Sequence, residues 1–226
     1  MMLKTRTIIA AVIGVVVSAA ATASTVTLSG TGFSVSYDDS ITSLFGTPTL
    51  NDGYLTFSPL AFGVSSSSTK PSFITGLLGL QVSTASGYVL NSVSLYEQGN
   101  FTLRGANSAF GVGTTLSVTP LDGAGAVNVD GQGEFSGSSF KRGTWIYSGA
   151  GAEVTGLSTK AADVMLDTLL FAQGGKGSFA TANLTAAKLT FGVAQIPLVP
   201  EPDAYLMLLA GLGMVGAVAR RRSAIR

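Results

Sequence analysis

Apolar and polar residues alternate one by one along much of the middle of this chain, and this alternation constrains the fold more than any other feature. Phe33, Val35 and Tyr37 alternate with serines, and the same rhythm returns in residues 188–193. Successive side chains of a β-strand point to opposite faces, so these segments predict strands with one buried face and one solvated face. We therefore expect an all-β, antiparallel domain.

Glycine-containing turn signals separate the alternating segments, at a spacing typical of an antiparallel β-sandwich or jelly roll. The expected turns are Asn51-Asp52-Gly53, Gly99-Asn100, Asp122-Gly123 and Gly174-Gly175, and residues 131–137 are expected to form a glycine-rich loop.

Residues 161–173 (AADVMLDTLLFAQ) fit two patterns. Val164, Leu166, Leu169 and Leu170 nearly form a helical stripe, but a glycine pair and another alternating run follow closely. We predict a strand here, with a helix as the alternative.

The first 23 residues have the pattern of a secretory signal peptide. Lys4 and Arg6 precede an apolar run of about ten residues, and Ala21-Thr22-Ala23 matches the small-x-small cleavage pattern. We expect a signal helix that directs the chain to the Sec translocon, and cleavage by signal peptidase between Ala23 and Ser24.

A second apolar segment, residues 204–219, lies near the other end and is followed at once by Arg220, Arg221 and Arg222. A basic cluster directly after an apolar helix is the positive-inside signature. The pattern predicts a single transmembrane helix in the inner membrane, a cytoplasmic C-terminus, and an exported domain before it. Residues 1–23, 24–196 and 197–226 are thus expected to be a signal peptide, an extracytoplasmic β-sandwich and a C-terminal sorting region.

The order of features at the C-terminus resembles the PEP-CTERM sorting signal of Gram-negative bacteria. Pro200-Glu201-Pro202 precedes the apolar helix and the arginine cluster, and a leader stands at the other end of the chain. The resemblance implies that exosortase, a membrane protease-transpeptidase, recognises the tripeptide, cuts nearby and releases the domain to the cell surface or outside. It also implies an association with exopolysaccharide and biofilm, and it leaves the task of residues 24–196 open.

Composition excludes much of the usual catalytic chemistry. The chain has no histidine and no cysteine, which excludes Ser-His-Asp triads, imidazole or thiolate metal sites and disulfides. A formal net charge of +1 gives no reason to expect a nucleic-acid partner. We assign no catalytic residue, cofactor or metal, and expect a non-enzymatic surface or matrix protein.

Two alternatives concern glycans. In the first, a carbohydrate-binding module, an exposed Trp145 stacks on a sugar ring beside Tyr147, which has the same strand parity. In the second, a glycan-acting enzyme, two carboxylates act as a pair.

The acidic pairs suggested by spacing are Asp38 with Asp39, Asp130 with Glu134, and Asp163 with Asp167, the last expected to face together only on a helix. Residues 128–134 also place oxygen ligands at alternate positions, the rhythm of a calcium site, without the length of an EF-hand loop.

Overall fold

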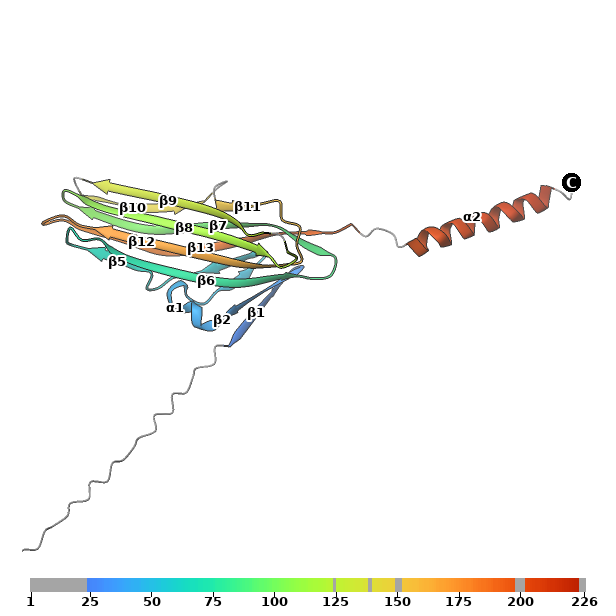
Figure 1. The fold of residues 1–226 in the computed structure, drawn as a ribbon, viewed down its shortest axis with the longest axis horizontal. Coiled ribbons are helices and arrows are strands. Elements are labelled where there is room, and N and C mark those ends of the chain that lie inside the picture. Colours follow the sequence, from blue (N-terminus) through green and yellow to red (C-terminus); the bar gives the residue numbers. More distant parts are fainter. Residues whose placement is uncertain (1–23, 124, 138–139, 149–151, 198–201, 224–226) are drawn as a thin grey trace, which may run out of the picture.

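The computed structural model describes residues 24–123, 125–137, 140–148, 152–197 and 202–223. Within them, two antiparallel sheets enclose one hydrophobic core. This confirms the predicted all-β fold, and the arrangement is that of a β-sandwich (Figure 1).

The first sheet has six strands. In spatial order they are β1 (Thr25–Gly30), β2 (Phe33–Asp38), β6 (Ser72–Thr84), β12 (Ala161–Gln173), β8 (Ser108–Pro120) and β9 (Val127–Gly137).

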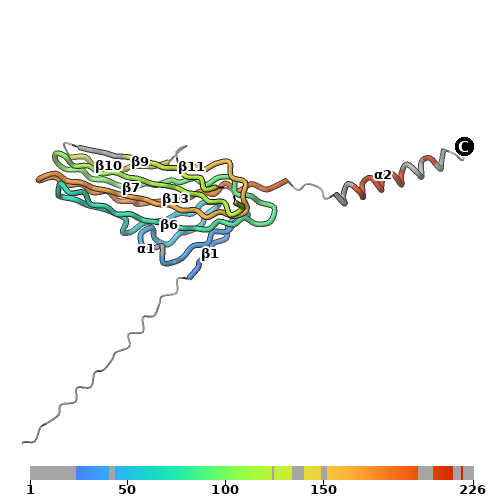
Figure 2. Tube along the Cα trace, viewed as in Figure 1, coloured from blue at the N-terminus to red at the C-terminus, as the bar shows by residue number. Residues whose placement is uncertain are grey.

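The second sheet has seven strands. Five follow in the order β10 (Lys141–Tyr147), β7 (Tyr88–Arg104), β13 (Phe179–Gln195), β4 (Tyr54–Phe57) and β3 (Thr49–Asn51), while β5 (Gly63–Ser66) pairs with β13 and β11 (Glu153–Val154) pairs with β7. The long strands β6, β7 and β13 run along the length of the sandwich (Figure 2).

Within the described residues, helical structure is confined to short turns and the C-terminal region. The elements are η1 (Asp39–Ile41), a 3₁₀ turn, then α1 (Thr42–Phe45) and α2 (Pro202–Ser223). Within the described part of the chain, no helix combines the length and the apolar content that a membrane span needs. The predicted signal helix at residues 1–23 lies outside the described residues.

The core forms because each strand turns its apolar side chains toward the other sheet. In β2, Phe33, Val35 and Tyr37 are buried and the residues between them are partly exposed, as the alternation predicts. Residues 161–173 form a strand, as predicted, and Val164, Leu166 and Leu170 are fully buried on its inner face. The helical alternative for this segment is wrong.

Three of the predicted turns are present and two glycine-rich segments are not turns. Gly53 and Gly123, both with positive φ, lie in the connections β3–β4 and β8–β9, and Gly174-Gly175 lies between β12 and β13. Gly99-Asn100, in contrast, is inside β7, and residues 131–137 belong to β9. The reason is packing, because Gly99 and Gly131 leave room for aromatic rings.

Candidate functional site

The predicted sorting region directly follows the last core strand. β13 ends at Gln195, and α2 begins at Pro202, the last residue of the predicted tripeptide. Pro fits the first turn of a helix, because its missing N–H has no intrahelical partner there. Arg220, Arg221 and Arg222 lie in the last turn of α2, where positive charge complements the helix dipole. Pro200 and Glu201 lie outside the described residues.

The described apolar side chains of α2 are exposed. Leu206, Met207 and Leu209 have exposed fractions of 62%, 77% and 64%, and Met214 and Val215 are each 68% exposed. A helix that is apolar all round is typical of a membrane or of burial inside a protein. In Figure 1, α2 lies beyond the end of the sandwich at which β13 finishes.

At the other end of the domain, Ser24 contacts Asp39 in three ways. The Ser24 backbone N–H donates to Asp39 Oδ1 at 3.2 Å, and its hydroxyl donates to Oδ2 at 2.7 Å. The Asp39 backbone N–H in turn donates to the Ser24 carbonyl at 3.1 Å. The hydrogen bonds from Ser24 hold the pKa of the exposed Asp39 carboxyl below its ordinary value. Ala23 lies outside the described residues.

Trp145 is a core residue, and the expectation of an exposed stacking platform is wrong for it. Its side chain is 4% exposed and belongs to the hydrophobic core. The chain has one tryptophan, and burying so large a ring stabilises the fold more than leaving it in water.

Trp145 and Tyr147 nevertheless line one cavity, which we call the edge pocket. The edge pocket has a volume of about 200 Å³ and lies where β9 and β10, the edge strands of the two sheets, come together. Its lining residues are Val112, Thr114, Gly131, Gln132, Gly133, Trp145, Ile146 and Tyr147.

The aromatic rings of this pocket pack against two glycines. A Cβ atom on Gly99 would lie 1.9 Å from the Asn183 backbone oxygen and 2.4 Å from the Trp145 ring, and one on Gly131 would lie 2.0 Å from the Tyr147 ring. All three distances are far inside van der Waals contact. Any larger residue at Gly99 or Gly131 would therefore displace a ring or the backbone.

Behind the edge pocket lies a fully buried carboxylate, Glu97. It is 0% exposed and comes from β7, directly opposite Tyr147 on β10. Thr168 of the first sheet donates a hydrogen bond to Glu97 Oε1 at 2.6 Å. Burial raises the pKa of Glu97 from its ordinary value of 4.5 to about 7, and the hydroxyls of Thr168 and Thr114 offset part of that rise.

Three buried polar atoms of this region have no hydrogen-bond partner within the described part of the chain. They are Glu97 Oε2, Thr114 Oγ1 and Trp145 Nε1, from β7, β8 and β10. Thr114 lies near the Glu97 carboxylate without the geometry of a hydrogen bond to it. Buried polar groups without partners are uncommon and costly in free energy. Three such atoms in one region therefore indicate a candidate binding site.

The structure describes both side chains of two of the carboxylate pairs suggested by spacing. Asp163 and Asp167 share a face of β12 although it is a strand, because residues four apart also have equal strand parity. Four residues of strand rise about 13 Å, so the two are well separated. Adjacent Asp38 and Asp39 lie at the end of β2 and the start of η1.

A different pair, which no local spacing indicates, lies on the outer face of the first sheet. Asp167 on β12 and Asp130 on β9 both oppose Thr115 on β8, and Thr115 donates to Asp130 Oδ1 at 2.7 Å. Two strand spacings separate them by about 10 Å. Both side chains are exposed.

The expected calcium ligands receive no support from the described residues. Among these residues, no group of three acidic side chains is arranged to hold a metal ion. The side chain of Glu134 lies outside the described set.

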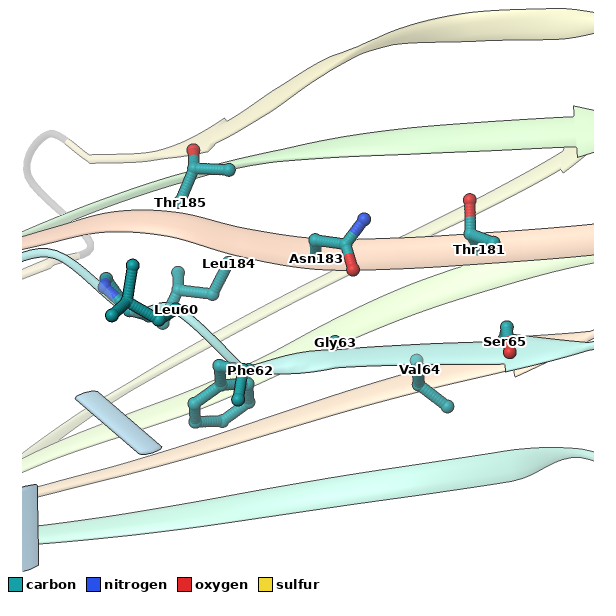
Figure 3. Close-up of a pocket in the computed structure, with 11 residues that line it drawn as sticks. Leu60, Phe62, Gly63, Val64, Ser65, Thr181, Asn183, Leu184 and Thr185 are labelled. Atoms are coloured by element: carbon teal, nitrogen blue, oxygen red, sulfur yellow. The ribbon is translucent and has the colours of Figure 1, made fainter. Parts of the chain in front are cut away.

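A larger and shallower hollow, of about 440 Å³, lies on the second sheet where β5 meets β13 (Figure 3). The Asn183 amide oxygen points toward β5, where a Cβ on Gly63 would lie 2.0 Å from it. Leu60 on the rim is 96% exposed. The described side chains there include no buried unpaired polar atom, in contrast to the edge pocket.

The fold and the C-terminal extension together define the class, a β-sandwich protein with a helical sorting tail. The family model described as the PEP-CTERM protein-sorting motif matches residues 198–222. The chain thus carries a PEP-CTERM sorting motif, and the resemblance seen in the sequence is confirmed. No curated protein matches the chain.

The chain matches several solved structures at low similarity. TmCBM61 in complex with β-1,4-galactotriose is 12% identical with a TM-score of 0.20, covering 77% of this chain and 89% of that one. The family 11 carbohydrate-binding module from Clostridium thermocellum is 17% identical with a TM-score of 0.19, covering 58% and 89%. A structure of infectious bursal disease virus, Gx strain, is 10% identical with a TM-score of 0.22, covering 81% and 60%. At these TM-scores the likenesses carry no argument about function.

Proposed function

We propose that this chain is an exported β-sandwich protein that exosortase processes at its C-terminal motif and releases to the cell surface or the extracellular matrix. The match of residues 198–222 to the sorting motif carries the proposal. The motif begins three residues after β13 ends, so a cut near Glu201 would separate the sandwich from α2 without removing a core strand.

The exposed apolar side chains of α2 support a transient stay in the inner membrane. Leu206 and Met207 are largely exposed to solvent, which is unfavourable in water and favourable among lipid chains. The arginines of the last turn would remain on the cytoplasmic side. Removing α2 would therefore convert a membrane-held precursor into a soluble domain.

The contacts of Ser24 support the proposed cut by signal peptidase between Ala23 and Ser24. Cleavage there converts the Ser24 amide into a charged ammonium group, which would lie beside the Asp39 carboxylate. The new terminus would then be held at the start of β1 by the residue that already accepts two hydrogen bonds from Ser24.

Fractionation of cells that express matched variants tests the sorting proposal. We expect Glu201→Ala, combined with Pro200→Ala and Pro202→Ala, to leave the full-length chain in the membrane fraction. Pro197→Ala, just outside the matched residues, is the control and should be released normally. Release of the triple variant at the wild-type rate would contradict the proposal.

As a second candidate function, we propose that the sandwich binds glycan through the edge pocket, which would fit an association with exopolysaccharide and biofilm. The observation that favours it is that Trp145 and Tyr147 line one cavity together with the polar side chains of Thr114 and Gln132. Apolar walls with a few polar groups are the usual composition of a small-molecule site.

Retention on a column of extracellular polysaccharide from the producing cells tests this candidate. We expect wild-type protein to be retained and Tyr147→Ala to elute early, while Tyr88→Ala, at the far end of β7, behaves as wild type. Equal elution of the wild type and Tyr147→Ala would refute it.

We further propose that the domain is not an enzyme. Asp130 and Asp167 are the best-placed acidic pair that we find, at a separation near the upper end of the range of about 6.5–9.5 Å typical of inverting glycosidases. Both are exposed, so they lack the burial that tunes one carboxyl as a general acid. Hydrolysis of the matrix polysaccharide by the wild type, abolished in Asp130→Asn and Asp167→Asn, would overturn this proposal.

A further inference from the structure

An unusual set of buried polar groups lies in or beside the residues that line the edge pocket. Trp145 Nε1 can only donate, ionised Glu97 Oε2 can only accept, and Thr114 Oγ1 can do both. All three atoms are buried and none has a partner in the described part of the chain. Trp145 and Thr114 line the pocket directly, and Glu97 lies behind them within the electrostatic reach of Tyr147.

A hydroxyl group is the smallest organic group that satisfies such a set. It accepts from the indole N–H through its oxygen and donates its own hydrogen to the carboxylate or to the threonine. A carboxylate ligand would be repelled by Glu97 whenever that group is ionised, and an ammonium ligand would leave the indole N–H without an acceptor. The polar groups therefore select for neutral, hydroxyl-bearing molecules.

The rest of the pocket limits the size and shape of the ligand. Its volume of about 200 Å³ leaves room for one six-membered ring and not for a chain of them. Val112 and the rings of Trp145 and Tyr147 supply apolar walls, while Gln132 supplies an amide near the mouth. A pyranose ring has the matching pattern, with C–H groups on its faces and hydroxyls at its edge.

We propose that the edge pocket is a monosaccharide subsite, in which one sugar hydroxyl hydrogen-bonds to the indole N–H of Trp145 and to the Thr114–Glu97 pair. The proposal rests on the second candidate function for the class of ligand and goes beyond it by naming the recognising atoms. Trp145 acts here through the edge of its indole ring, not through an exposed face.

The single tryptophan makes the test direct, since the full chain has one indole N–H resonance. The ¹⁵N-labelled full chain in mild detergent is titrated with D-glucose, D-galactose and tetrahydropyran, a six-membered ring without hydroxyls. We expect a saturable shift of the indole resonance with at least one sugar and none with tetrahydropyran. No saturable shift with either sugar would mean that the pocket takes only water, and an equal shift with tetrahydropyran would mean apolar filling; each result overturns the proposal.

Matched variants locate the hydroxyl contact. Thr114→Val and Glu97→Gln should weaken sugar binding about tenfold, the loss expected for one hydrogen bond to a buried group. Thr115→Val, the next residue on the outer face of β8, should bind as wild type. Circular dichroism checks that each variant folds. If Glu97→Gln does not fold, the affinity of Thr114→Val alone tests the proposal. Unchanged affinity in Thr114→Val would also overturn the subsite.

The two glycan experiments fail separately. Saturable sugar binding without retention on polysaccharide would leave the subsite standing and refute the second candidate function. Retention on polysaccharide without any indole shift would place glycan binding elsewhere and refute the subsite.

Discussion

Thr168 Oγ1 and Glu97 Oε1 form a 2.6 Å hydrogen bond that joins the two sheets through the middle of the core. Thr168 lies on β12 of the first sheet and Glu97 on β7 of the second, and both side chains are 0% exposed. A buried carboxylate normally needs a cation or several donors. Here burial raises the pKa of Glu97 to about 7, and the hydroxyls of Thr168 and Thr114 offset only part of that rise.

Stability should fall as the pH rises through the window set by Glu97. Its pKa is about 7 in the fold and 4.5 ordinarily, so between these values the folded chain holds a proton that the unfolded chain has lost. The contribution of Glu97 to the free energy of unfolding is therefore highest below about pH 4.5. It falls by about 3 kcal/mol as the pH rises to 7. Tyr147 faces Glu97 from β10, and its pKa, raised above 10.0, lies outside this window.

Glu97→Gln tests this dependence because glutamine keeps the shape and does not titrate. Urea unfolding at several pH values should show a flatter profile for the variant across the window and a higher stability than wild type above about pH 7. An equally steep fall in the variant would show that another group causes the dependence.

Removing the Thr168 hydroxyl should destabilise the fold. Thr168→Val keeps the branched shape and leaves Glu97 without its donor, at a cost of about 1–3 kcal/mol in the free energy of unfolding when the carboxylate is ionised. The cost should shrink at low pH, where Glu97 is neutral. Thr144→Val, on the exposed face of β10, is the control and should change stability by less than about 0.5 kcal/mol.

The packing of the aromatic rings against Gly99 and Gly131 can be tested in one series of alanine variants. Gly131→Ala pushes a Cβ into the Tyr147 ring, and Gly99→Ala pushes one against both the Asn183 backbone oxygen and the Trp145 ring. Overpacking of this kind costs about 1–3 kcal/mol. Gly79→Ala is the matched control, since this strand glycine of β6 has nothing within 4 Å of a new Cβ. Thermal unfolding should rank the control at or above wild type; equal stability of all three variants would contradict the role given to the rings.

Alternation predicts much of this fold because strand parity is a local property. It identifies the inner residues of β2 and β13, and the alternating run after Gly174-Gly175 favours a strand for residues 161–173. It also contains the signal for Glu97, which continues the buried parity of Val93 and Leu95 along β7. An acidic residue in that position indicates a buried carboxylate.

The features that local sequence patterns do not predict have one physical origin, which is contact between segments far apart in the chain. Gly99 and Gly131 have the composition of turns, yet their function is to receive rings from β10, and this depends on pairing that no local window contains. The Asp130–Asp167 pair and the unpaired atoms of the edge pocket likewise depend on strand order. The glycan-binding alternative placed Trp145 on the surface, because a sequence indicates the strand parity of a residue and not which face of the strand is covered.

The mass of the mature protein tests the central claim most directly. Intact mass spectrometry of protein released by wild-type cells should give a chain that begins at Ser24 and lacks α2, while cells without exosortase should retain a membrane-bound chain that still carries α2 and the arginine cluster. A released chain in wild-type cells that still contains residues 202–223 would contradict the account.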